Sequence, residues 1–119
     1  MTKTKVESNL VQAVIDGLLE KKGEDIKVLD MRNLEAAVAD YFIICTGNSH
    51  PQVDALADSV DEFVKKSTGE NPLGMEGREN SEWILIDYSD VVVHIFLPET
   101  RTFFKLENLW SDANIHTIN

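Results

Sequence analysis

The sequence has few basic residues, and that shortage narrows the range of functions at once. Lysine and arginine account for 11 of the 119 residues, against 21 aspartates and glutamates, which gives a formal charge of -10 at pH 7. A field of this sign repels phosphate backbones and anionic lipid surfaces. We therefore expect neither direct nucleic-acid binding nor membrane binding, and a basic protein is the better-matched partner.

Cysteine and long apolar runs are also scarce. The single cysteine, Cys45, cannot form an internal disulfide and ends the apolar run Tyr41-Phe42-Ile43-Ile44-Cys45, which is typical of a buried thiol in a reducing compartment. No apolar run approaches the ~20 residues that span a bilayer, and the N-terminal residues lack the apolar centre of a signal peptide. These absences predict a cytoplasmic protein. The near-average composition predicts a single domain over residues 1–119.

Apolar spacing in the first half of the chain predicts a helix, two strands and a second helix. The first helix carries Val6, Leu10, Val14 and Leu18 four residues apart, between a capping-box pattern at residues 4–7 and a stop at Gly23. Residues 26–31 and 40–46 have the β-branched and apolar content of strands, and residues 32–39 between them are expected to hold a helical turn. The second helix follows the N-cap pattern of Ser49, Pro51 and Gln52, and its apolar stripe runs over residues 53–64.

The second half predicts strands and a short helix. Glycine and proline punctuate residues 69–77, where a short edge strand is expected. Residues 83–88 and 91–97 give the strongest strand patterns, residues 100–113 suit a short helix, and His116 is expected in a frayed tail. The order of elements predicts an α/β (α+β) fold, with a mixed sheet of about five strands and flanking helices.

The two strongest strands are separated only by Ser89 and Asp90, which predicts an antiparallel hairpin. In that register Tyr88 pairs with Val91 and Trp83 pairs with Phe96. Alternation then places aliphatic side chains on one face, which the helices should cover: Ile84, Ile86, Val91, Val93 and Ile95, ending in Tyr88. The other face mixes aromatic, apolar and ionisable side chains: Trp83, Leu85, Asp87, Val92, His94 and Phe96.

This mixed face is the predicted partner-binding surface, because one short helix cannot cover all of it and accessible aromatic patches are typical of protein interfaces. Trp83 and Phe96 are expected to anchor the partner, and Leu85 and Val92 to flank them. His94 is the expected polar neighbour. Acidic residues are expected around the face: Glu76, Glu79, Glu82, Asp87 and Asp90. Asp87 and Asp90 are the expected counter-charges to the partner's lysines or arginines. Two alternatives stand beside this interpretation: the C-terminal segment with Phe103, Phe104 and Trp110 buries the face, or a second copy of the chain covers it as a homodimer.

A search for catalytic chemistry assigns no catalytic, cofactor-binding or metal-binding residue. Cys45 lies in the middle of a strand, so pairing with His94 or His50 as a nucleophile is not favoured. The three histidines lack the short spacing of a zinc site. The turn from Gly47 to Ser49 could offer amide groups to a nucleotide phosphate, but it has one glycine and no nearby lysine. Nucleotide binding or nucleotidyl transfer through this turn is therefore kept only as an alternative function.

Five stretches of the sequence closely resemble the ribosomal silencing factor, or Iojap, family. They are residues 28–32, 39–49, 76–77, 83–96 and 106–113, and they follow the family order across nearly the whole chain. The hairpin stretch is the most specific of them. Ser89 departs from the family pattern, in which many relatives would carry glycine.

The resemblance implies a non-enzymatic repressor of translation. Members of this family bind the large ribosomal subunit through its basic protein L fourteen, block joining to the small subunit, and damp translation when nutrients are short. The fold is expected to resemble a nucleotidyltransferase core without its active-site carboxylates. A homodimer is also expected from the family.

Overall fold

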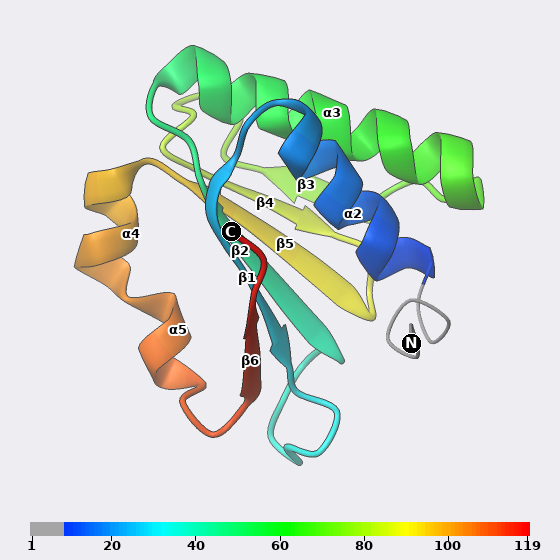
Figure 1. Ribbon diagram of the computed structural model, residues 1–119, viewed down its shortest axis with the longest axis vertical. Coiled ribbons are helices and arrows are strands. Elements are labelled where there is room, and N and C mark those ends of the chain that lie inside the picture. The colour runs from blue at the N-terminus through cyan, green and yellow to red at the C-terminus, as the bar shows by residue number, and fades with distance from the viewer. Residues whose placement is uncertain (1–8) are drawn as a thin grey trace.

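A six-stranded mixed sheet organises the protein in a computed structural model, of which residues 9–119 are described (Figure 1). The strand order is β3-β4-β5-β2-β1-β6, in which β2 and β5 run parallel and all other neighbours run antiparallel. In chain order the elements are α2 (Asn9–Glu20), β1 (Glu24–Asp30), β2 (Tyr41–Thr46), α3 (His50–Thr68), β3 (Gly74–Glu76), β4 (Trp83–Asp87), β5 (Val91–Phe96), α4 (Pro98–Phe104), α5 (Leu106–Leu109) and β6 (Asn114–Thr117). The predicted fold class is confirmed.

Strand β6 is the element that the sequence analysis missed. It pairs with β1, where His116 lies opposite Val28, so the expected frayed tail is instead the sixth strand of the sheet. All four of its side chains are exposed, and no alternation of apolar residues marks them as a strand. Backbone pairing with β1, rather than side-chain burial, therefore defines this edge.

Helices α2 and α3 lie together across one face of the sheet, while α4 and α5 lie on the opposite side (Figure 1). Gly17 permits the close approach of α2 to α3, because a Cβ at this position would lie 2.9 Å from the Cα of Val60. The Ser59 hydroxyl donates a hydrogen bond to the Gly17 carbonyl at 2.7 Å. Beneath the two helices, the predicted aliphatic face of the hairpin is buried as expected: Ile84, Ile86, Tyr88, Val91, Val93 and Ile95.

The start of α3 follows its predicted capping pattern. The Ser49 hydroxyl accepts the Gln52 amide N–H at 3.1 Å, with Pro51 in the first turn. Gln52 does not close the capping box onto Ser49. Its side-chain oxygen accepts the Asn48 N–H, and its amide nitrogen donates to the carbonyls of Lys21 and Lys22. This side chain thereby joins the end of α2 to the start of α3.

Residues 32–39, where a helical turn was expected, contain single hydrogen-bonded turns, with the Leu34 N–H donating to the Met31 carbonyl and the Ala37 N–H to the Leu34 carbonyl. One other local prediction needs correction. Residues 100–113 hold two short helices instead of one. Lys105 has φ 48, a left-handed conformation that ends α4 before α5 begins. At the other end of the chain, the capping-box pattern predicted at residues 4–7 lies outside the described residues.

The register of the β4–β5 hairpin is confirmed. Trp83 lies opposite Phe96 and Asp87 opposite Val92, and the Tyr88 N–H donates to the Val91 carbonyl at 2.9 Å. In the turn, Ser89 has φ 78, a conformation that favours glycine. The Asp87 carboxylate accepts the Ser89 N–H at 2.7 Å and holds this turn in place. The departure from the family's glycine thus falls on a strained position.

We expect Ser89→Gly to raise the free energy of unfolding by about 1 kcal/mol, because glycine adopts a positive φ without the Cβ clash. Urea denaturation followed by circular dichroism measures the change. Ser89→Ala, which keeps the Cβ, is the matched control and should give no gain. An equal gain from both substitutions would contradict the assignment of strain to φ.

Candidate functional site

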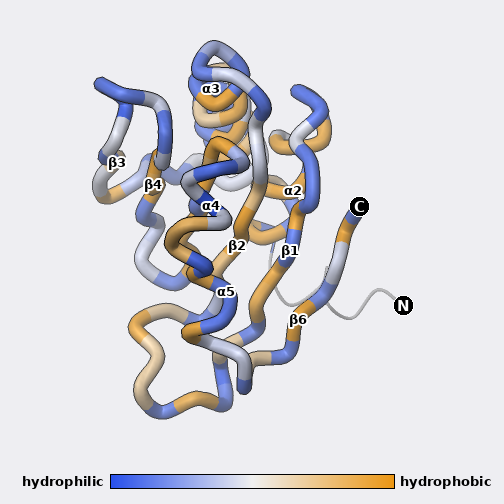
Figure 2. Tube along the Cα trace, turned by 90° about the vertical axis from the view of Figure 1, so that its left-hand side faces the viewer, coloured by the Kyte–Doolittle hydropathy of each residue, from blue (hydrophilic) through white to orange (hydrophobic). Residues whose placement is uncertain are grey.

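The mixed face of the hairpin is covered over only part of its area. Four predicted contact residues are partly exposed: Trp83, Leu85, Asp87 and Val92. His94 and Phe96, by contrast, are 3% and 0% exposed. The expectation that these two side chains are accessible was wrong, because α4 and α5 lie in front of this part of the sheet (Figure 2). On the sheet itself, any contact with a partner therefore falls on the four partly exposed residues that α4 and α5 leave uncovered.

The C-terminal segment covers only part of the mixed face, so the alternative in which it buries the whole face is correct for that part alone. Trp110 packs edge-on against Phe42 with ring centroids 6.0 Å apart, and Phe104 packs against Trp83 at 4.8 Å. Phe104 is nevertheless 47% exposed and Phe103 is 78% exposed. The segment thus buries the part of the face over β2 and β5 and extends the open part with two further rings. We call Trp83, Phe103 and Phe104, together with Leu85 and Val92, the aromatic surface.

Trp83 is held in one orientation. Its indole Nε1–H donates to Nδ1 of His94 at 3.1 Å, and its ring lies 4.9 Å from that of Phe96. The backbone at Gly77, with φ 94, approaches the Trp83 carbonyl so closely that a Cβ there would collide with it. A side chain fixed on these sides loses little conformational freedom when a partner covers its remaining face.

His94 acts as the acceptor for this tryptophan. Because Nδ1 accepts a hydrogen bond, the neutral ring carries its proton on Nε2, and this nitrogen is buried without a partner among residues 9–119. The ring packs 4.7 Å from Phe42 and stacks on Phe96. Burial without a compensating charge lowers the pKa of His94 to about 4. The imidazole is therefore neutral near pH 7 and serves as a fixed acceptor.

The negative charge beside Trp83 comes only in part from the predicted acidic residues. Asp87 caps the hairpin turn through its bond to the Ser89 N–H. Asp90 lines a different hollow, between the start of α2 and the end of α3, and its role as a counter-charge stays a prediction. Both lie at the turn end of the hairpin, whereas Trp83 begins β4. At the tryptophan end, Glu82 precedes Trp83 and Glu76 lies opposite Leu85, both as predicted around the face, and Glu99 of α4 adds a carboxylate that was not predicted.

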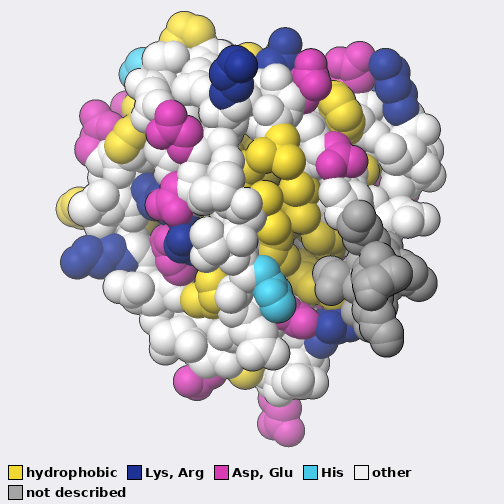
Figure 3. Space-filling model, viewed as in Figure 1, with side chains coloured by type: hydrophobic (Ala, Val, Ile, Leu, Met, Phe, Trp, Pro, Cys, Tyr) yellow, Lys and Arg dark blue, Asp and Glu magenta, His cyan; other side chains and the backbone are white. Residues whose placement is uncertain are grey.

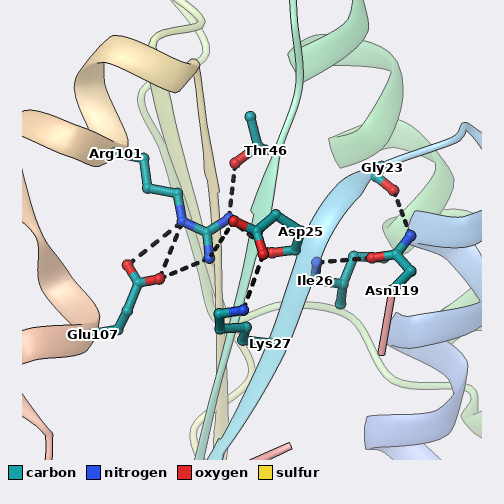
Figure 4. Close-up of polar contacts among 8 residues, drawn as sticks. All are labelled: Gly23, Asp25, Ile26, Lys27, Thr46, Arg101, Glu107 and Asn119. Atoms are coloured by element: carbon teal, nitrogen blue, oxygen red, sulfur yellow. Dashed lines mark hydrogen bonds and ion pairs between the residues drawn. The ribbon is translucent and has the colours of Figure 1, made fainter. Parts of the chain in front are cut away.

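Arg101 fixes the position of α4 and so of the two phenylalanines (Figure 4). Its guanidinium is buried and donates to the Asp25 carbonyl at 2.8 Å, to the Thr46 hydroxyl at 2.7 Å and to the Glu107 carboxylate at 2.8 Å. These groups come from β1, the end of β2 and α5. A single side chain thus joins α4 to three other parts of the chain.

A bulge in β1 supplies one of these acceptors. The pairing of β1 with β2 is irregular between Glu24 and Lys27, and Asp25 there has φ 51. The bulge turns the Asp25 carbonyl toward Arg101, while the adjacent Ile26 N–H donates to the Asn119 side chain at 2.9 Å (Figure 4). Backbone groups freed by a bulge need partners when buried, and the two side chains provide them.

The Gly47 turn, considered above for phosphate binding, has two of its three amide groups occupied. The Gly47 N–H donates to the Phe96 carbonyl, and the Asn48 N–H donates to Gln52. A Cβ at Gly47 would lie 2.9 Å from the Val53 side chain, so the glycine allows α3 to pack closely. The turn therefore offers little to a nucleotide. Burial raises the pKa of the neighbouring Cys45 thiol to about 12, which makes the thiol a poor nucleophile.

A second apolar area opens between α2 and β6 (Figure 3). A hollow of about 280 Å³ there is lined by aliphatic side chains that include Val11, Ile15, Val28 and Ile118. Its aromatic member, Tyr41, is buried beneath the Arg32 guanidinium. As far as the described residues go, this area lacks the exposed aromatic anchors that are enriched at the centres of interfaces. The aromatic surface is therefore the stronger candidate.

Sequence reasoning placed Trp83 on the right face but missed Phe103, Glu99 and Arg101 as parts of the site. One signal was available: Pro98 is typical of the first turn of a helix, and Glu99 and Phe103 lie four residues apart, which puts them on one helix face. Within residues 9–119, no group of three or more histidine, cysteine or acidic side chains is placed to hold a metal ion. Nor is any helix in that range long and apolar enough to cross a membrane.

Comparisons with known proteins give one consistent family. Residues 3–119 match the family described as "Ribosomal silencing factor during starvation". Ribosomal silencing factor RsfS of Bacillus subtilis is 44% identical over 94 residues, covering 79% of this chain and 78% of that protein. Its namesake from Halalkalibacterium halodurans is 39% identical over 104 residues, 87% of each chain. A crystal structure of a Chromobacterium violaceum protein superposes with a TM-score of 0.81 at 39% identity, covering 87% of this chain and 84% of that one.

We expect Arg101→Met to lower the free energy of unfolding by about 3 to 5 kcal/mol, because it leaves the carboxylate of Glu107 and two buried acceptors without their donor. Arg101→Lys keeps the charge but not the planar fork and should lose less. Urea denaturation measures both, with Lys65→Met on the exposed face of α3 as control. Unchanged stability of Arg101→Met would refute the role of this side chain.

The pKa of His94 predicts a specific loss of stability in acid. The imidazole of the unfolded chain binds a proton near pH 6.5, but that of the folded chain binds one only near pH 4. The unfolded state binds more protons between these values, so stability falls as the pH drops through this window. Between pH 7 and about pH 4.5 this amounts to about 2 to 3 kcal/mol.

His94→Phe keeps an aromatic ring in the stack but cannot titrate. In urea titrations, the free energy of unfolding of His94→Phe should therefore fall by about 2 to 3 kcal/mol less than that of wild type between pH 7 and about pH 4.5. Parallel pH profiles for wild type and His94→Phe would show that His94 is not the titrating group.

Proposed function

Because the chain belongs to the ribosomal silencing factor family, we propose that it binds the large ribosomal subunit through the basic ribosomal protein L fourteen and blocks joining to the small subunit. The protein would thereby repress translation, acting in the cytoplasm when nutrients are limiting. The family supports a silencing role, and the resemblance described above supplies the partner and the step that is blocked.

The exposure of the aromatic surface is the observation that carries this proposal. Trp83 is oriented by His94 and Phe96, and the exposed rings of Phe103 and Phe104 extend it. Aromatic side chains held rigidly at a surface are typical of the residues that contribute most of the affinity in protein interfaces. A monomer gains nothing from leaving such rings in water, so their exposure favours a partner that covers them.

Charge complements this surface. The formal charge of -10 favours encounter with a basic protein, and carboxylates lie at both ends of the hairpin. Such charges raise the association rate and fix the relative orientation, while the aromatic contacts slow dissociation. We propose that inhibition is steric: the bound protein occupies the volume that the small subunit needs when it joins.

Trp83→Ala and Phe103→Ala should each weaken binding to purified large subunits by about tenfold or more, because each removes an aromatic anchor. Phe103 is the cleaner substitution, since its ring is 78% exposed and contributes little to the core. Sedimentation of mixed large and small subunits should show fewer joined ribosomes with wild-type protein and a recovery of joined ribosomes with either variant.

Val38→Ser provides the matched control, because Val38 is 77% exposed in the loop between β1 and β2. This variant should bind like wild type. The mass of the free protein over a dilution series shows whether a homodimer competes for the same surface. A folded wild-type protein that leaves the joined fraction unchanged would refute the proposed function.

A further inference from the structure

A hollow of about 380 Å³ opens beside the aromatic surface, where α4 begins. Three elements form its walls: the segment before β4 contributes Glu82, the first turn of α3 contributes His50, and α4 contributes Glu99, Phe103 and Phe104. His50 is fixed there by donating its Nδ1–H to the Asn80 carbonyl at 2.9 Å. The hollow is thus a joint feature of distant segments and continues the surface that Trp83 begins.

The two carboxylates in this hollow have no ion-pair partner within residues 9–119. Several other acidic side chains do have one: Asp30 pairs with Arg32, Glu62 with Lys66, and Asp54 and Asp58 with Arg78. No lysine or arginine of the described part of the chain lines the hollow. The nearest basic residue along α4 is Arg101, whose buried guanidinium is already engaged by Glu107 and β1. The hollow therefore carries uncompensated negative charge.

Two phenylalanine rings add an apolar wall to this charge. Phe103 and Phe104 lie 5.0 Å apart at an interplanar angle of 88°, so they form a right-angled corner. A cation lying on an aromatic face gains from the ring quadrupole, and guanidinium is the cation that stacks most readily while also donating to carboxylates. Carboxylates and ring faces together match an arginine side chain better than a compact, strongly hydrated lysine ammonium.

We propose that this hollow receives an arginine side chain of the protein that docks on the aromatic surface. The guanidinium lies against the Phe103 and Phe104 rings and donates to Glu82 and Glu99, while the aliphatic stem of the arginine packs toward Trp83. This inference rests on the proposed function for the identity of the docked protein, but the chemistry of the hollow is independent of it. When the partner covers the site, these charge pairs lose water, so their main effect is on the dissociation rate.

A titration with N-acetyl-arginine amide tests the hollow without any ribosome. In nuclear magnetic resonance spectra of the ¹⁵N-labelled protein, the arginine compound should shift the amide signals of Glu82 and of residues 99–104. The citrulline analogue, which has the same shape and no charge, should not. The double variant Glu82→Gln/Glu99→Gln changes two exposed side chains and should abolish the shifts, whereas Glu79→Gln should retain them. Equal shifts with citrulline, or shifts that persist in the double variant, would overturn the inference.

Binding to purified large subunits then connects the hollow with the proposed function. The double variant should bind about tenfold more weakly than wild type, with a faster dissociation rate and a smaller dependence on salt. If wild type binds and Trp83→Ala weakens binding, but the double variant binds as tightly as wild type, the arginine socket is wrong and the proposed function stands. If wild type does not bind, the proposed function fails, and the arginine titration alone decides whether the hollow is a cation site.

Discussion

The buried guanidinium of Arg101 is the constraint on which the arrangement of this protein's binding side depends. A buried charge is tolerated only when its hydrogen bonds are complete, and here the acceptors come from β1, β2 and α5. The arginine itself lies on α4, so this short helix can dock in only one place. That placement determines which rings of the opposite sheet face are covered and which stay in contact with water.

The two faces of the sheet consequently differ in kind. Beneath α2 and α3 the hairpin presents only aliphatic side chains and a tyrosine, all buried. On the other side α4 and α5 cover Phe42 and Phe96 but leave Trp83 half-buried. The neutral imidazole of His94 connects the covered and the open parts of this face. It packs against Phe42 in the covered part and accepts the indole N–H of Trp83 at the edge of the open part. The recognition side chains are thus part of a rigid structure rather than of a loose loop.

Sequence reasoning could establish the hairpin register, because a two-residue turn and strict alternation leave one pairing that keeps the aliphatic residues together. Alternation assigns a side chain to a face but does not say what covers that face, which is why Trp83 and Phe96 fell into one group although only one is exposed. Arg101 was out of reach for a different reason. Two of its acceptors lie 55 and 76 residues away in the chain, and one is a carbonyl released by a bulge. Strand β6 gave no signal because its side chains are all exposed.

The two margins of the sheet are short. The outermost strands β3 and β6 contain three and four residues, and Pro72 stands just before the first of them. Short edges offer few unpaired amide and carbonyl groups to a foreign strand, which limits polymerisation by strand addition. Association must then proceed through side chains instead of backbone ladders. A protein with such edges can expose aromatic side chains to solvent and still bind selectively, because non-specific strand pairing does not compete.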